Sequence, residues 1–105
     1  MAKVMKDGKV ENEPVIFRKY PDGDIIALFP EIAADNIGYF CESYMHIGQH
    51  SAASPQAVIS QTKPATPIEY AVLQDELERV VGYDLKIIKR FRYSHQLERM
   101  KQARI

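Results

Sequence analysis

The chain has 105 residues, of which 46% are hydrophobic and 27% are charged, and these values are ordinary for one globular domain. A single cysteine excludes an intrachain disulfide, and the first residues lack the basic and apolar regions of a signal peptide. No apolar run is long enough to span a membrane. The sequence therefore predicts a cytoplasmic protein without membrane association.

The formal net charge of zero conceals an uneven distribution of charge along the chain. Residues 85–105 contain seven lysines and arginines but one acidic residue, so this segment has a net charge of +6, and residues 1–84 carry the balancing −6. Such a basic end is typical of an anion-binding segment, of a solvated tail, or of a tail that folds back on the protein's own acidic helix. The sequence leaves these alternatives open.

Four strands are predicted from alternating apolar and polar residues, over residues 15–20, 24–29, 37–47 and 83–93. Residues 1–13 precede them and are predicted to form a mobile N-terminal arm, with a small hairpin as the alternative. The first two strands are expected to pair, because Pro21-Asp22-Gly23 has the residues that a tight turn needs. Pro30 is expected to end the second strand, and residues 48–53 are expected to form a loop.

Two helices are predicted between the third and fourth strands. Ser54-Pro55 is typical of a helix start and begins the short first helix. The second helix is predicted over residues 66–81, where Thr66 and Glu69 can form a capping box. Gly82 is expected to end this helix in the left-handed conformation that glycine adopts easily.

The order β-β-β-α-α-β favours a small α+β domain over residues 14–93. Hairpin connections make the first three strands antiparallel, and the helical crossover returns the fourth strand parallel to the first or third. The sequence thus predicts a four-stranded mixed sheet with both helices packed on one face. Residues 94–105 are predicted to form a basic C-terminal helix or tail.

The other face of such a sheet would carry aromatic rings and cationic side chains. The candidate nucleic-acid-binding residues are Arg18, Phe40, Tyr44, Lys86, Arg90 and Arg92. Aromatic rings stack on unpaired bases, and guanidinium groups pair with phosphates. We therefore predict a non-enzymatic binding or accessory protein with nucleic acid as the favoured ligand. The alternative is a protein-interaction module that binds a partner, or a second copy in a homodimer, through the same face.

A third hypothesis concerns residues 39–51, which contain the only cysteine and two of the three histidines. Cys41, His46 and His50 are residues of the types that bind zinc or form a thiol–imidazole pair. Their spacing matches no zinc motif that we know, and alternation along a strand places Cys41 and His46 on opposite faces. We therefore expect neither a metal nor an enzymatic thiol, and an inert buried cysteine is the simpler interpretation.

The loop candidates His46, Gly48, Gln49 and His50 precede the predicted helix start at Ser54. Free N–H groups at a helix N-terminus attract anions, which makes this loop a possible anion site. It lacks the glycines and the lysine of a phosphate-binding loop, so an ordinary capped loop is the alternative. No cofactor is expected.

The segments PVIFR, ALFPE, YMHIGQH, KPATPIEY and GYDLK resemble a group of short uncharacterised proteins from gut-type bacteria and from their phages and conjugative elements. The resemblance covers roughly residues 14–90. It implies a bacterial accessory protein, associated with mobile elements. Since the group has no activity known to us, the resemblance implies no role for any particular residue.

Overall fold

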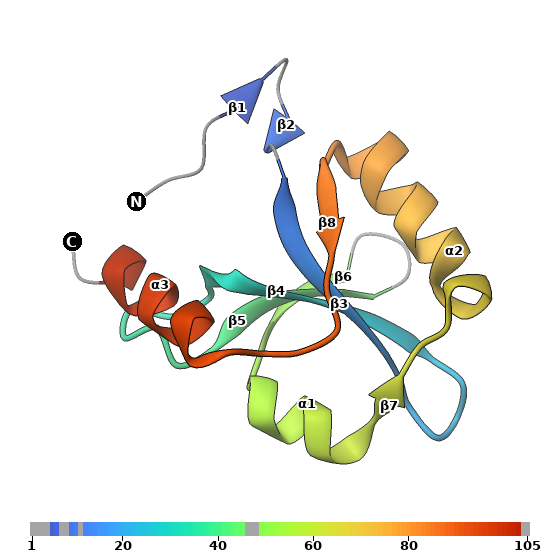
Figure 1. Ribbon diagram of the computed structural model, residues 1–105, viewed down its shortest axis with the longest axis horizontal. Coiled ribbons are helices and arrows are strands. Elements are labelled where there is room, and N and C mark those ends of the chain that lie inside the picture. The colour runs from blue at the N-terminus through green and yellow to red at the C-terminus, as the bar shows by residue number, and fades with distance from the viewer. Residues whose placement is uncertain (1–4, 7–8, 11, 46–48, 104–105) are drawn as a thin grey trace.

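The computed structural model describes residues 5–6, 9–10, 12–45 and 49–103 (Figure 1). In chain order its elements are β1 (Met5–Lys6), β2 (Lys9–Val10), β3 (Glu13–Lys19), β4 (Ile25–Ala33), β5 (Cys41–Met45), β6 (Gln49–Ala53), α1 (Pro55–Gln61), β7 (Lys63–Pro64), α2 (Pro67–Glu76), a π-helical turn (Leu77–Val81), β8 (Leu85–Ile87) and α3 (Tyr93–Ala103). The α+β class and the mixed sheet that the sequence predicts are confirmed. β1 and β2 form a separate antiparallel pair, as in the hairpin alternative for the N-terminal residues.

The main sheet has six strands, so the prediction of four strands is wrong. Its order is β6-β5-β4-β3-β7, and β8 also pairs with β3. β6 lies where the sequence predicts a loop, and it pairs antiparallel with β5. β7 is a two-residue strand, also antiparallel, on β3. Both additional strands are short and polar, which explains why periodicity alone does not reveal them.

β8 has three residues, although the sequence predicts a strand over residues 83–93. It runs parallel to β3, as predicted for the crossover strand, and pairs with Glu13, Pro14 and Val15. Further along β3, the same edge is occupied by β7, which pairs with Arg18 and Lys19. This edge of β3 is therefore not free for β8 to extend further. The chain leaves the sheet after Ile88, whose N–H donates to the carbonyl of Val15 at 2.9 Å.

β4 continues through Pro30 to Ala33, although proline is expected to end the strand. The ladder with β5 is irregular here, because Glu42 pairs with Phe29 and the adjacent Cys41 pairs with Ala33. A bulge of this kind accommodates proline, which has no N–H to donate. Side chains from α3 bind the backbone groups that the bulge leaves unpaired.

Two side chains of α3 make these contacts. The Arg99 guanidinium donates to the carbonyl of Pro30 at 2.6 Å and to that of Gly38 at 3.0 Å. The Gln102 amide accepts from the N–H of Ala33 at 3.0 Å and donates to the carbonyl of Glu31. α3 is thus part of the domain, in the position that the sequence assigns to a basic helix or tail.

Residues 34–40 form a loop beneath α3, where the sequence predicts the start of the third strand. The Asp35 carboxylate accepts from the N–H of Gly38 at 2.7 Å and of Phe40 at 3.2 Å, which holds the loop closed. Gly38 has φ +79° and lies against the backbone of Met100 in α3. This close approach requires a residue without a side chain.

Helices cover both faces of the sheet, so the prediction of helices on one face is wrong. On one face, the α2 region, which comprises α2 and the π-helical turn, packs Leu73 and Leu77 on a cluster of buried residues: Val15, Phe17, Ala27, Phe29 and Tyr44. On the other face, Val58 of α1 packs on Ile16, Ile26, Leu28 and Cys41, with Ile88 and Phe91 against them. Figure 1 shows α1, α2 and α3 placed around the sheet on different sides.

The predicted helix starts and stops are confirmed. The side chain of Ser54 accepts from the N–H of Ala57 at the start of α1. Thr66 and Glu69 form the capping box of α2, and Gly82 ends the helical segment with φ +101°. Glu69 also pairs with Lys19, and this hydrogen bond holds the pKa of Glu69 low, at about 2.

Replacing Gly38 by alanine tests whether α3 docks as described. Gly38 and Gly23 both have positive φ, but a Cβ on Gly38 would meet the Met100 backbone at 2.8 Å, whereas Gly23 has open space around it. We expect Gly23→Ala to lower the free energy of unfolding by roughly 1 kcal/mol and Gly38→Ala by roughly 2–4 kcal/mol, measured by urea denaturation. Equal losses would contradict the contact between the loop and α3.

Candidate anion-binding site

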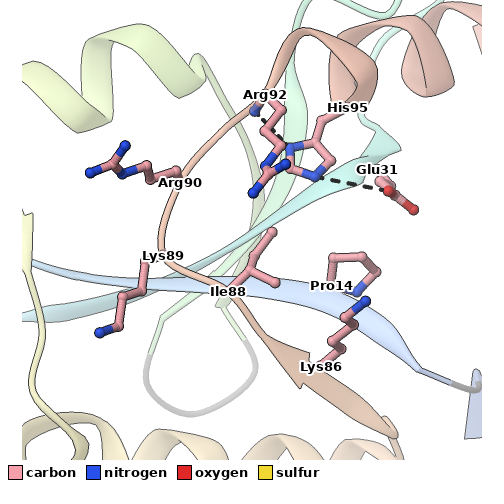
Figure 2. A pocket seen from close by; sticks show the side chains of 8 residues that line it. All are labelled: Pro14, Glu31, Lys86, Ile88, Lys89, Arg90, Arg92 and His95. Carbon is pink, nitrogen blue, oxygen red and sulfur yellow. Dashed lines mark hydrogen bonds and ion pairs between the residues drawn. The ribbon is translucent and has the colours of Figure 1, made fainter.

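A basic pocket lies between β8, the connection that follows it and the first turn of α3 (Figure 2). Its volume is about 490 Å³, and it is lined by Pro14, Glu31, Lys86, Ile88, Lys89, Arg90, Arg92 and His95. Four of these eight side chains are cationic and one is acidic. We call this the basic pocket.

The cationic side chains approach the basic pocket from different directions. Figure 2 shows Lys86 beside Pro14, and the Arg92 guanidinium next to the His95 ring on the other side of Ile88. Lys89 and Arg90 extend away from Glu31. All four are exposed to solvent. Because the four cations are spread out in this way, they can contact an anion that is longer than one phosphate group.

His95 fixes the start of α3 at the wall of this pocket. The ring Nδ1 of His95 accepts a hydrogen bond from the backbone N–H of Arg92 at 2.9 Å. The backbone N–H of His95 donates to the Arg92 carbonyl at 3.0 Å. This reciprocal pair resembles a capping box, with imidazole in place of the usual carboxylate or amide. It begins α3 at Tyr93, one residue before the basic C-terminal helix or tail that is predicted over residues 94–105.

The other ring nitrogen of His95 faces the acidic side of the pocket. Because Nδ1 accepts a hydrogen bond, the neutral ring carries its proton on Nε2, which lies 4.0 Å from the Glu31 carboxylate. His95 is buried, so its ring orientation is fixed by packing as well as by these contacts. The backbone of Arg92 is therefore held in place at the start of α3.

Three of the six predicted nucleic-acid-binding residues, Lys86, Arg90 and Arg92, come together in the basic pocket. Tyr44 does not, because it is 1% exposed beneath the α2 region and its hydroxyl donates to Glu76. Phe40 is partly exposed, with its ring against Tyr39, and does not line this pocket.

Arg18 is also buried, and its guanidinium binds the C-terminal end of α1. It donates to the Thr62 hydroxyl at 2.9 Å and to the carbonyls of Thr62 and Ile59 at 2.7 Å and 3.3 Å. Burial lowers the pKa of Arg18 from its ordinary value. A cation at a helix C-terminus satisfies the last carbonyls and the helix dipole, so Arg18 has a structural role.

Of the Cys/His candidates, Cys41 and His50 are separated. His46 and Gly48 lie outside the described residues, and Gln49 and His50 belong to β6 instead of a loop. His50 pairs with Tyr44 and its ring lies 4.7 Å from that of Tyr44, which places it on the face opposite Cys41. Within the residues that the structure describes, no three Cys, His, Asp or Glu side chains could hold a metal ion.

Comparisons with protein-family models, with curated proteins and with solved structures found no match to this chain. The resemblance to short bacterial proteins thus stays a prediction. In the part of the chain that the structure describes, no helix is long and apolar enough to cross a bilayer.

Sequence reasoning missed Lys89, His95 and Glu31 as lining residues. A signal was present in the run Lys89-Arg90-Phe91-Arg92-Tyr93, where cations and rings alternate. Interpreted as a strand, this run places its cations on both faces of the sheet. Since the run lies outside β8, its cations reach the same pocket.

Cys41 is expected to be chemically inert in the native protein. It is fully buried, and burial raises the pKa of its thiol to about 12, although the nearby Arg99 cation opposes this shift. At about pH 8.5 the thiolate fraction should then be roughly a thousandfold below that of an exposed thiol. Alkylation by iodoacetamide should be correspondingly slow until denaturant is added. Rapid alkylation of the native protein would contradict the buried position.

Proposed function

We propose that the protein binds single-stranded nucleic acid through the basic pocket. The observation that carries the proposal is the convergence of Lys86, Arg90 and Arg92 on one pocket, with Lys89 beside them. Exposed lysines and arginines supply the phosphate contacts that dominate affinity for nucleic acids. In this role the protein catalyses no reaction and acts as a binding or accessory protein.

The distribution of the cations supports a strand of several phosphates over a single small anion. Lys86 lies on β8 and Arg92 immediately precedes α3, while Lys89 and Arg90 extend from the connection between them. Aromatic residues lie close by in sequence, at Phe91 in the same connection and at Tyr93, the first residue of α3. Rings beside a cationic track are typical of proteins that bind unpaired strands.

A charge-matched pair of double variants tests this function. Lys86→Gln/Arg90→Gln removes one lysine and one arginine from the pocket, and Lys63→Gln/Arg79→Gln removes the same types from exposed positions outside it. Binding of a fluorescent oligodeoxythymidine should weaken roughly tenfold in the first variant and change little in the second. The salt dependence should lose about one unit of slope for each phosphate contact removed.

Two results would reject the nucleic-acid proposal. One is the absence of oligonucleotide binding by the unaltered protein at low salt. The other is equal weakening in both double variants, because this would reflect overall charge and not the pocket.

We propose self-association through the outer side of the α2 region as a second candidate function. Ile68, Val72 and Val80 are 91%, 73% and 78% exposed there. Asp75 and Arg79 form an ion pair of 3.5 Å on the same helical segment. In a two-fold dimer each patch meets its own copy, so Asp75 of one chain can face Arg79 of the other.

Replacing Val72 by glutamate tests the dimer. We expect light scattering to give the mass of a dimer for the unaltered protein and of a monomer for Val72→Glu, because two buried carboxylates would face each other. Gln61→Glu adds the same charge at an exposed position at the end of α1 and should leave the dimer intact. A monomeric mass for the unaltered protein at high concentration would rule out this candidate.

A further inference from the structure

A second pocket adjoins the basic pocket on the other side of Arg92. Its volume is about 240 Å³, and its lining residues are Tyr39, Pro55, Gln56, Phe91, Arg92, Tyr93, Gln96 and Arg99. These residues come from the loop beneath α3, the start of α1, the connection after β8, and α3. We call it the aromatic pocket.

Two rings of the aromatic pocket, those of Tyr39 and Tyr93, are exposed although their backbone is held in place. Tyr39 is 47% exposed and Tyr93 is 70% exposed. The loop that carries Tyr39 is closed by Asp35 and bound by Arg99 through the carbonyl of Gly38. Phe91 is the inner ring, since it packs against the cluster beneath α1. The pocket is therefore preformed and presents the exposed rings of Tyr39 and Tyr93.

We propose that the aromatic pocket binds one unstacked base of the strand whose phosphates occupy the basic pocket. This inference rests on the proposed nucleic-acid function and adds a base-binding subsite to it. Arg92 lines both pockets, so the phosphate and base sites are adjacent. A volume below the roughly 300–1,000 Å³ of pockets for larger ligands suits a flat ring better than a whole nucleotide.

The polar lining residues are suited to the edge of a base. Gln56 of α1 and Gln96 of α3 each carry an amide that can both donate and accept hydrogen bonds. Bases present donors and acceptors side by side on their Watson–Crick edges, and proteins that bind unpaired strands recognise these edges while aromatic rings stack on the base plane. Tyr39 and Tyr93 supply exposed rings for stacking, and the two amides can contact the edge.

A comparison of base-bearing and abasic strands tests the subsite separately from the phosphate contacts. The probes are oligodeoxythymidine and an abasic oligomer with the same number of phosphates. The unaltered protein should bind the thymidine oligomer roughly tenfold more tightly, as expected for one stacked base. Tyr93→Leu should remove most of this difference without changing the affinity for the abasic oligomer. Tyr93→Phe keeps the ring and should preserve the difference.

The possible outcomes distinguish the two proposals. Equal affinity for both oligomers, with the salt dependence and the Lys86→Gln/Arg90→Gln effect intact, would overturn the base subsite and leave the proposed function standing. Failure of both oligomers to bind would overturn both proposals. Binding of a polyglutamate peptide without binding of either oligomer would also overturn both, in favour of an acidic protein partner.

Discussion

The contact between α3 and the bulge in β4 is the interaction on which the rest of the structure depends. Proline in a strand leaves an irregular ladder, and the backbone groups around it need partners once they are buried. Arg99 and Gln102 supply them through the carbonyls of Pro30 and Glu31 and the N–H of Ala33. Burial disfavours the charged form of the Arg99 guanidinium and lowers its pKa, and the hydrogen bonds to the carbonyls of Gly38 and Pro30 offset this cost.

The position of α3 in turn determines what the basic segment can do. The first turn of α3 lies at the wall of both pockets because Arg99 and Gln102 hold its later turns on the sheet, and because His95 binds the backbone of Arg92. The cations of residues 85–105, which give this segment its net charge of +6, are therefore not equivalent. Arg99 is internal, whereas Lys86, Lys89, Arg90 and Arg92 surround a pocket. A freely solvated tail does not describe residues 85–99.

Sequence reasoning succeeded where the deciding signals are local. The starts of α1 and α2 and the end at Gly82 follow from caps that neighbouring residues supply. It failed on the number of strands and on the covering of both faces, because these depend on which edges and surfaces remain free after distant segments pack. One feature of the sequence does indicate that both faces are covered, since residues 25–29 are all apolar, as in strands that are buried on both faces.

In the candidate site, too, the positions of single side chains depend on distant segments and could not be predicted from the sequence. Arg18 and Arg90 are the same residue type and both appear as exposed strand cations in the sequence, but the carbonyls at the end of α1 bind Arg18. β7 occupies the edge of β3 beyond Val15, so the run from Lys89 to Tyr93 cannot continue as a strand. As a strand, this run would have placed Lys89, Phe91 and Tyr93 on one face of the sheet and Arg90 and Arg92 on the other. Outside the sheet, Arg92 lies between the basic and aromatic pockets, and this arrangement could not be derived without the position of β7.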